Sequence, residues 1–108
     1  MVTSTNVLYF ESGNLLFNNL PGTTDVSVAN YVDLWTLPHV EVERLYAELG
    51  AALPKLAELN WAIFEYEDVT FDLVPGTTDV SVSVGYSSWV LNEAELTRLH
   101  KELGDYLN

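Results

Sequence analysis

The sequence predicts an α+β protein, in which a βββα unit occurs twice and forms an antiparallel sheet with two helices packed on one face. Three observations indicate this fold. The octapeptide at residues 21–28, Pro-Gly-Thr-Thr-Asp-Val-Ser-Val, recurs unchanged at residues 75–82. Alternating apolar and polar residues run through the end of each octapeptide, which is typical of a half-buried strand. Apolar residues at helical spacing follow in both places. We therefore expect a tandem duplication with pseudo-twofold symmetry.

The duplication covers almost the whole chain. At an offset of 54 residues, positions 6–54 align with positions 60–108 without a gap, and 21 of the 49 pairs are identical. We predict a single domain over residues 1–108, made of two repeats, 6–54 and 60–108, joined by residues 55–59. A unit of roughly 50 residues buries too little apolar surface to be secure alone, so the two repeats should share one core.

Three strands are predicted at the start of each repeat. In the second repeat, residues 61–64 are apolar on both faces, and residues 69–73 alternate between apolar and polar. The third strand alternates over residues 79–86, with Val80, Val82, Val84 and Tyr86 on its apolar face. The first repeat has counterparts at residues 8–10, 15–18 and 26–32. Such two-faced strands are typical of an antiparallel sheet with one side on the core.

A helix is predicted after the strands of each repeat. Asn92 and Glu95 form a capping-box pattern at the start of the second helix. The leucine stripe of that helix is Leu96, Leu99, Leu103 and Leu107, and the matching stripe is Val42, Leu45, Leu49 and Leu53. Pro38 suits the first turn of the first helix. We expect Gly50 and Gly104 to cap the helix ends, because glycine inside a helix costs about 1 kcal/mol.

Composition limits the class of protein. The chain has 108 residues, of which 48% are hydrophobic, and this is enough for a core. It has no cysteine, so neither a disulfide nor a thiolate metal site can form. No apolar run approaches the roughly 20 residues of a membrane span, and the first residues do not resemble a secretory signal. We expect no membrane association and a cytoplasmic location.

The charge of the chain is strongly negative. Sixteen acidic residues and four basic residues give a net charge of −12. Such a surface repels phosphate backbones and anionic lipids at ordinary salt concentrations. Four explanations of the acidity remain open: solubility, a high-salt cytoplasm, a basic protein partner, or mimicry of nucleic-acid charge.

The octapeptide and two histidines are the candidates for chemistry. If the two octapeptide loops converged, their hydroxyls and carboxylates could hold a cation. A turn is the simpler interpretation, because Pro-Gly makes a tight turn and the side chains of Thr and Asp hydrogen-bond its backbone. His39 and His100 have no positioned nucleophile or carboxylate, so we expect them on the surface or at a helix cap. We predict no catalytic residue, no cofactor and no metal site, and therefore not an enzyme.

Acidic residues are distributed unevenly between the repeats. Residues 1–54 hold six acids and one base, net −5, whereas residues 55–108 hold ten acids and three bases, net −7. The excess lies on one predicted hairpin, whose candidate partner-binding residues are Glu65, Tyr66, Glu67, Asp68 and Asp72. Charge at the rim of an interface raises the association rate, and an aromatic side chain anchors the complex. Features that the two repeats share are those that folding requires. The extra charge and the aromatic residue of the second repeat are therefore candidates for a role in binding.

These observations predict a small, acidic, non-catalytic protein-binding module. In a sharper form, it is an inhibitor that occupies a basic, nucleic-acid-binding site on a partner protein, as phage-encoded DNA mimics do. The alternative is a module that binds single-stranded nucleic acid on an aromatic sheet face, which four basic residues disfavour. We expect either a monomer with internal pseudo-dimer symmetry or a homodimer.

Overall fold

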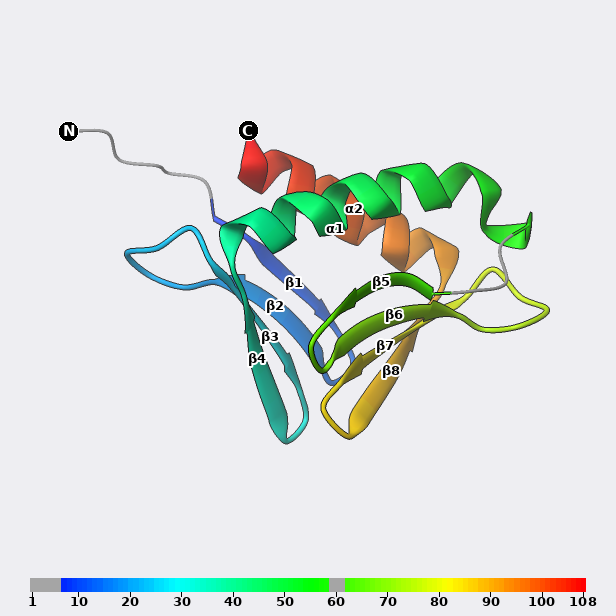
Figure 1. The fold of residues 1–108 in the computed structure, drawn as a ribbon, viewed down its shortest axis with the longest axis horizontal. Coiled ribbons are helices and arrows are strands. Elements are labelled where there is room, and N and C mark those ends of the chain that lie inside the picture. The colour runs from blue at the N-terminus through cyan, green and yellow to red at the C-terminus, as the bar shows by residue number, and fades with distance from the viewer. Residues whose placement is uncertain (1–6, 59–61) are drawn as a thin grey trace.

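The structure, a computed structural model, describes residues 7–58 and 62–108 and has an α+β fold (Figure 1). The first half contains strands β1 (Tyr9–Ser12), β2 (Leu15–Asn19), β3 (Val26–Asn30) and β4 (Asp33–Leu37), then helix α1 (His39–Ala52) and the 3₁₀ helix η1 (Leu53–Glu58). The second half contains β5 (Ala62–Tyr66), β6 (Val69–Leu73), β7 (Val80–Val84), β8 (Ser87–Leu91) and α2 (Glu93–Leu107). The first residue of each predicted repeat, at positions 6 and 60, and the first residue of the strand predicted at 61–64 lie outside the described residues.

Each half has four strands, so the predicted βββα unit is wrong by one strand. The segments predicted as single third strands, 26–32 and 79–86, reverse direction near their ends. Tyr31 and Gly85 have positive φ angles of 47° and 62°, and each begins a two-residue turn. The chain then pairs back on itself as β4 and β8. In the second half Val84 and Tyr86 keep the period of two across the turn, which is why the pattern did not reveal it; in the first half Asn30 interrupts the alternation just before the turn.

The strands form two sheets, and the predicted single sheet is therefore also wrong. Strands β1–β4 and strands β5–β8 are separate antiparallel meanders, each in chain order. Their apolar faces meet, because the ring centroids of Phe17 in β2 and Phe71 in β6 lie 6.2 Å apart. Each ring also makes an edge-to-face contact at 5.9 Å with a phenylalanine of its own sheet, Phe10 or Phe64. A sheet with one apolar face must cover it, and here the other sheet and the helices do so.

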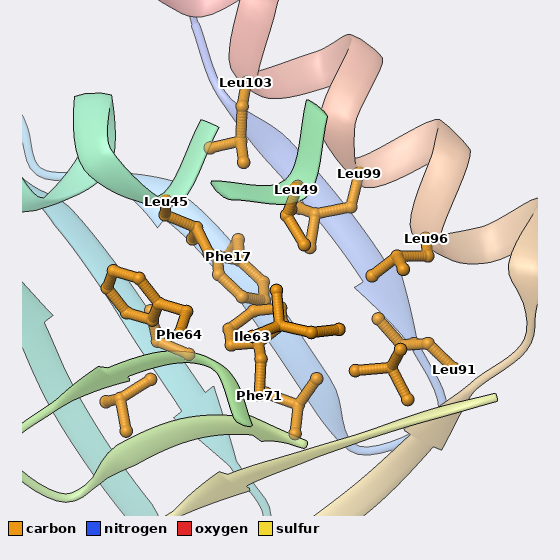
Figure 2. Packing of buried hydrophobic residues seen from close by; sticks show 14 of the residues in the cluster. Phe17, Leu45, Leu49, Ile63, Phe64, Phe71, Leu91, Leu96, Leu99 and Leu103 are labelled. Carbon is orange, nitrogen blue, oxygen red and sulfur yellow. The ribbon is translucent and has the colours of Figure 1, made fainter. Parts of the chain in front are cut away.

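The helices close the core above the two sheets (Figure 1). Both predicted leucine stripes are confirmed up to their last members: Val42, Leu45 and Leu49 of α1 are buried, as are Leu96, Leu99 and Leu103 of α2. These side chains converge with Ile63, Phe64 and Phe71 from the second sheet (Figure 2). The capping box of Asn92 and Glu95 is present, with both hydrogen bonds formed. No helix within the described residues is long and apolar enough to cross a membrane.

Each helix reaches the edge strand of the other half. Arg44 of α1 lies over the ring of Phe64 at 4.4 Å and donates to the backbone oxygen of Glu65 at 2.7 Å. Arg98 of α2 lies over Phe10 at 4.3 Å and donates to the backbone oxygen of Glu11 at 3.0 Å. The two halves are therefore interlocked. Neither sheet is covered by the helix of its own half alone.

The helices touch at two glycines that were expected to be caps. Gly50 and Gly104 lie inside α1 and α2, where a side chain would press on a ring of the facing helix. A Cβ atom on Gly50 would lie 3.0 Å from the His100 ring, and one on Gly104 would lie 2.9 Å from the Tyr46 ring. The Tyr46 and His100 rings stack between them, with centroids 4.4 Å apart. These glycines therefore permit close helix packing, and His100 belongs to the helix contact rather than to the open surface or a cap.

Candidate protein-binding surface

The five residues predicted to bind a partner lie on the β5–β6 hairpin. Glu65 and Tyr66 end β5, Glu67 and Asp68 form the turn, and Asp72 lies in β6. The four acids are exposed. Within residues 7–58 and 62–108, their carboxylates form no hydrogen bond and no ion pair. The hairpin thus presents four carboxylates to solvent, while the Arg44 guanidinium contacts its backbone at Glu65.

Tyr66 differs from its acidic neighbours. It is half-buried and packs against the core, and its partner across the ladder is the buried Val69. The aligned position in the first half, Ser12, is buried as well. The structure therefore brings the four acids to the surface and turns most of Tyr66 inward, so this ring cannot project as an exposed anchor.

The β5–β6 turn lies at one end of the molecule together with the two-residue turns that join β1 to β2, β3 to β4 and β7 to β8 (Figure 1). Three hydrogen bonds connect the turns. The Gly85 N–H donates to the Asp68 backbone oxygen at 3.0 Å, and the Tyr31 N–H donates to the Asn14 backbone oxygen at 3.3 Å. The Asp33 carboxylate accepts from the Tyr86 N–H at 3.1 Å, which links the two halves. We call this end, formed by residues 13–14, 31–33, 67–68 and 85–87, the turn end.

The turn end carries exposed apolar side chains that sequence reasoning missed. Tyr86 is 104% exposed, and Tyr31 and Val32 are 79% and 78% exposed. The pattern placed Val32 and Tyr86 on the apolar face of a continuing strand, where a core position was expected, and it singled out no role for Tyr31. Gly85 was the signal in the sequence for this turn, because glycine adopts the positive φ angles that tight turns require. Its mate in the first half is Tyr31, which gives no such signal.

Most of the basic residues are occupied in local contacts. Arg44 and Arg98 hold the helices to β5 and β1, and Arg44 also pairs with Glu41 at 2.6 Å. Lys101 pairs with Asp105 at 2.8 Å, and this hydrogen bond raises the pKa of the lysine. Only Lys55 of the four basic residues forms no such contact within the described part of the chain.

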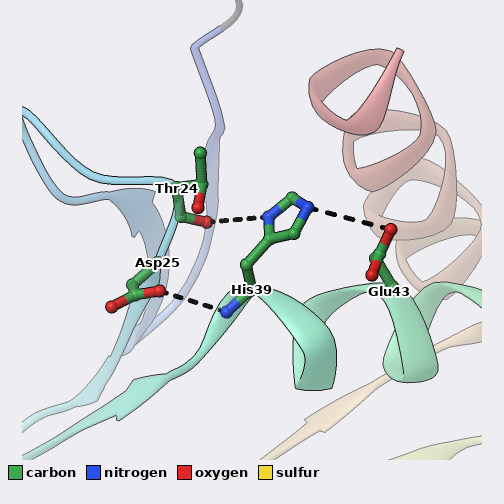
Figure 3. A network of polar contacts seen from close by, with 4 residues as sticks. All are labelled: Thr24, Asp25, His39 and Glu43. Carbon is green, nitrogen blue, oxygen red and sulfur yellow. Dashed lines mark hydrogen bonds and ion pairs between the residues drawn. The ribbon is translucent and has the colours of Figure 1, made fainter.

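The octapeptide of the first half anchors helix α1 (Figure 3). Thr23 donates to the Leu20 backbone oxygen and accepts from the Asp25 N–H, so it completes the predicted turn. The Asp25 carboxylate accepts from the backbone N–H of His39 at 3.1 Å. The His39 ring lies 3.2 Å from the Thr24 backbone oxygen and 3.8 Å from the Glu43 carboxylate. His39 therefore lies at a helix start, as predicted.

The second octapeptide makes the same turn in a different setting. Thr77 donates to the Val74 backbone oxygen and accepts from the Asp79 N–H. The loop borders a shallow pocket lined by uncharged residues: Ala57, Leu73, Gly76, Thr77 and Thr78. Within the described ranges, no group of three or more His, Asp or Glu side chains is placed to hold a metal ion. The chemistry of both loops is that of a hydrogen-bonded turn.

Comparison with protein-family models, with curated proteins and with solved structures finds no significant match to this chain.

Proposed function

We propose that this chain is a small, acidic, non-catalytic module that binds a basic surface on a partner protein. The observation that carries the proposal is the β5–β6 hairpin, where the carboxylates of Glu65, Glu67, Asp68 and Asp72 are exposed and form no ion pair within the described residues. In its sharper form the module is an inhibitor that occupies the nucleic-acid-binding site of that partner in the cytoplasm. The acids then take positions that phosphates would otherwise take.

The distribution of charge supports a protein partner rather than nucleic acid. Arg44 and Arg98 hold the helices to the edge strands, and Lys101 pairs with Asp105 on the exposed face of α2. A surface of net charge −12 repels a phosphate backbone. A basic partner is attracted instead, and exposed charges of this kind chiefly raise the association rate. The effect should weaken as salt increases, because the Debye length falls from about 10 Å at 0.1 M to about 3 Å at 1 M.

We also propose that the chain arose by tandem duplication and has internal pseudo-twofold symmetry. The sequence identity at an offset of 54 residues supports this origin. The reciprocal contacts support it too, since Arg44 and Arg98 occupy aligned positions and each packs on the aligned phenylalanine of the other half. On this view one chain already contains the two copies that such an interlocked core requires, and the module acts as a monomer.

The experiment compares two variants of equal net charge on a partner isolated by affinity from the native host. The first variant neutralises the hairpin with Glu65→Gln, Glu67→Gln, Asp68→Asn and Asp72→Asn. The control neutralises four other acids with Glu48→Gln, Glu58→Gln, Asp79→Asn and Glu93→Gln. We expect only the hairpin variant to associate roughly tenfold more slowly at low salt, with a flatter salt dependence. Equal association rates for the two variants would refute the proposed site.

A further inference from the structure

The geometry of the turn end points to an anchor that acts beside the acidic hairpin: Tyr31, Val32 and Tyr86 insert into an apolar cleft with a basic rim on the partner protein. This inference rests on the proposed function and deepens it by stating what the partner's site must contain. The hairpin acids supply attraction at a distance. The turn end supplies the contact that holds the complex.

The anchor residues project from the molecule instead of covering its core. The turns that carry them, β3–β4 and β7–β8, lie side by side at the end opposite the helices (Figure 1). Tyr86 and Tyr31 are among the most exposed large apolar side chains of the described residues. Tyrosine is enriched among residues that dominate binding energy, because its ring buries a large area at a low cost in conformational entropy.

The backbone of Tyr31 gives independent support. Its φ angle of 47° lies in the left-handed region, where glycine is strain-free and a bulky residue is an outlier. The aligned residue in the second half, Gly85, has a φ angle of 62° and is a glycine. Folding at this position is therefore served better by glycine. A strained, exposed tyrosine at this position points to a use of its side chain outside the fold.

Glu67 repeats this relationship in the other half. It has a φ angle of 51°, and its aligned residue Gly13 has a φ angle of 56°. Within the described ranges, Tyr31 and Glu67 are the two non-glycine residues with positive φ, and both lie at the turn end. One of them is an exposed aromatic side chain and the other is an exposed acid. Strained residues often cluster at functional sites, and here they mark one surface.

The turn end is held in place before any partner arrives. The Asp33 carboxylate bonds the Tyr86 N–H at 3.1 Å and lies 3.4 Å from the Ser87 hydroxyl. A Cβ atom on Gly85 would lie 2.8 Å from that carboxyl group, so the two turns are in close contact. The hydrogen bond from Tyr31 N–H to Asn14 fixes the other side. A preorganised surface loses less entropy on binding than a mobile one.

The chemistry of this surface defines its partner. Projecting rings require a concave, apolar floor, and the adjacent Glu67 and Asp68 require a basic rim. Sites for single-stranded nucleic acid combine these two features, because they stack bases on aromatic side chains within a basic groove. The tyrosine rings of the turn end would take the positions of bases and the acids those of phosphates. An anionic membrane does not fit, since it would repel the acids.

The test is a titration of the ¹⁵N-labelled full chain, followed by nuclear magnetic resonance, with two peptide probes. One is an eight-residue peptide of alternating lysine and tryptophan, and the other replaces tryptophan by serine at the same charge. We expect the tryptophan peptide to shift the amides of the turn end and to bind about fivefold or more tightly than the serine peptide. Tyr86→Ser and Tyr31→Gly should each remove most of this difference. The control Tyr9→Ser, at an exposed tyrosine in β1, should keep it.

The outcomes separate the inference from the proposed function. Equal binding of both peptides at the β5–β6 hairpin would overturn the anchor and leave the acidic site standing. Binding of both peptides at the acidic residues of the helices would count against the anchor and against the acidic hairpin as the binding site. Tyr31→Gly should keep or raise the melting temperature, because it restores the residue of the aligned position, so lost binding in this variant cannot be ascribed to unfolding. Insertion of Tyr86 into neutral phosphatidylcholine vesicles would contradict the inference that the anchor binds a protein.

Discussion

The Asp25 carboxylate accepts a hydrogen bond from the backbone N–H of His39 at 3.1 Å, so a residue of the octapeptide caps the first helix from a distance. Helix α1 needs this bond because its N-cap is Pro38, whose side chain has no acceptor. Helix α2 instead has Asn92 as its N-cap, whose side chain accepts from the Glu95 N–H and completes a capping box with Glu95. Within the described residues, the carboxylate of the aligned Asp79 accepts no hydrogen bond from a helix N–H.

Identical residues of the octapeptide should thus contribute differently to stability. We expect Asp25→Ala to lower the free energy of unfolding by about 1 kcal/mol, the usual effect of losing an N-cap. In a chain of this size, that corresponds to a fall in melting temperature of roughly 4–8 °C. The matched control Asp79→Ala should change stability by less than about 0.5 kcal/mol. Thermal and urea unfolding of the two variants provide the measurement, and equal losses would show that Asp25 is not a cap.

A second prediction concerns the approach of Trp89 to Gly13. A Cβ atom on Gly13 would lie 1.9 Å from the Trp89 ring, whose indole N–H donates to Ser12 at 3.3 Å. Gly13→Ala should therefore push the ring away in addition to straining a positive φ angle. Gly22→Ala is the control, because Gly22 has a φ angle of 77° and no atom within 4 Å of its built Cβ.

Both substitutions should lower the free energy of unfolding by about 1 kcal/mol, because alanine is strained in the left-handed backbone conformation. Gly13→Ala should cost about 1–3 kcal/mol more, which is the usual range for overpacking. Chemical denaturation of the two variants gives the difference. The account of the Trp89 contact fails if the two losses are the same within error.

A third prediction concerns Asn30, which is 1% exposed in β3. Its side-chain nitrogen is the one buried side-chain polar atom of the described residues without a hydrogen-bond partner. The aligned residue in the second half is the buried Val84. A buried, unsatisfied amide costs about 1–3 kcal/mol, so Asn30→Val should stabilise the fold by about 1 kcal/mol or more.

The reverse substitution provides the control. Val84→Asn places an amide at the aligned position of the other sheet and should destabilise the fold by a similar or larger amount. Differential scanning calorimetry of both variants measures the opposite shifts. A melting temperature that falls on Asn30→Val would mean that the amide has an interaction in solution that its surroundings do not reveal.

Patterns that depend on one element were predictable from the sequence. The helix stripes and the capping box at Asn92 follow from short-range spacing, and both are present. The fourth strands were not predictable in this way, because Val84 and Tyr86 keep the period of two across the turn at Gly85. A period of two does not distinguish one long strand from two strands joined by a turn with an even number of residues.

Contacts between the halves were the least predictable part. Nothing in the helix sequence states that Arg44 crosses to Phe64, because that contact depends on how two sheets face each other. The candidate site shows the same limit. The acids of the β5–β6 hairpin could be found from charge alone, whereas the exposure of Tyr31 and Tyr86 depends on turns that only the three-dimensional fold reveals.

The last prediction concerns the pH dependence of stability through Glu95. Two hydrogen bonds lower the pKa of this carboxyl below its ordinary value of 4.5. The larger effect comes from the Ser12 hydroxyl and the smaller one from the Asn92 backbone N–H. A lowered folded-state pKa means that the carboxylate stabilises the fold above pH 4.5. The contribution is lost as the pH falls through the folded-state pKa.

Glu95→Gln should therefore be less stable than the parent chain at pH 6 to 7, and the difference should shrink steadily as the pH falls from about 5 towards 3. Glu93→Gln is the matched control, because Glu93 lies in the same first helical turn, is exposed, and has no side-chain hydrogen bond within the described residues. The favourable effect of an acid on the helix dipole is common to both positions, so it cancels in the comparison. Melting temperatures of the three chains measured across this pH range decide the matter. A deficit for Glu95→Gln that stays constant down to pH 3, or one matched by Glu93→Gln at every pH, would show that the bond to Ser12 does not favour the charged form.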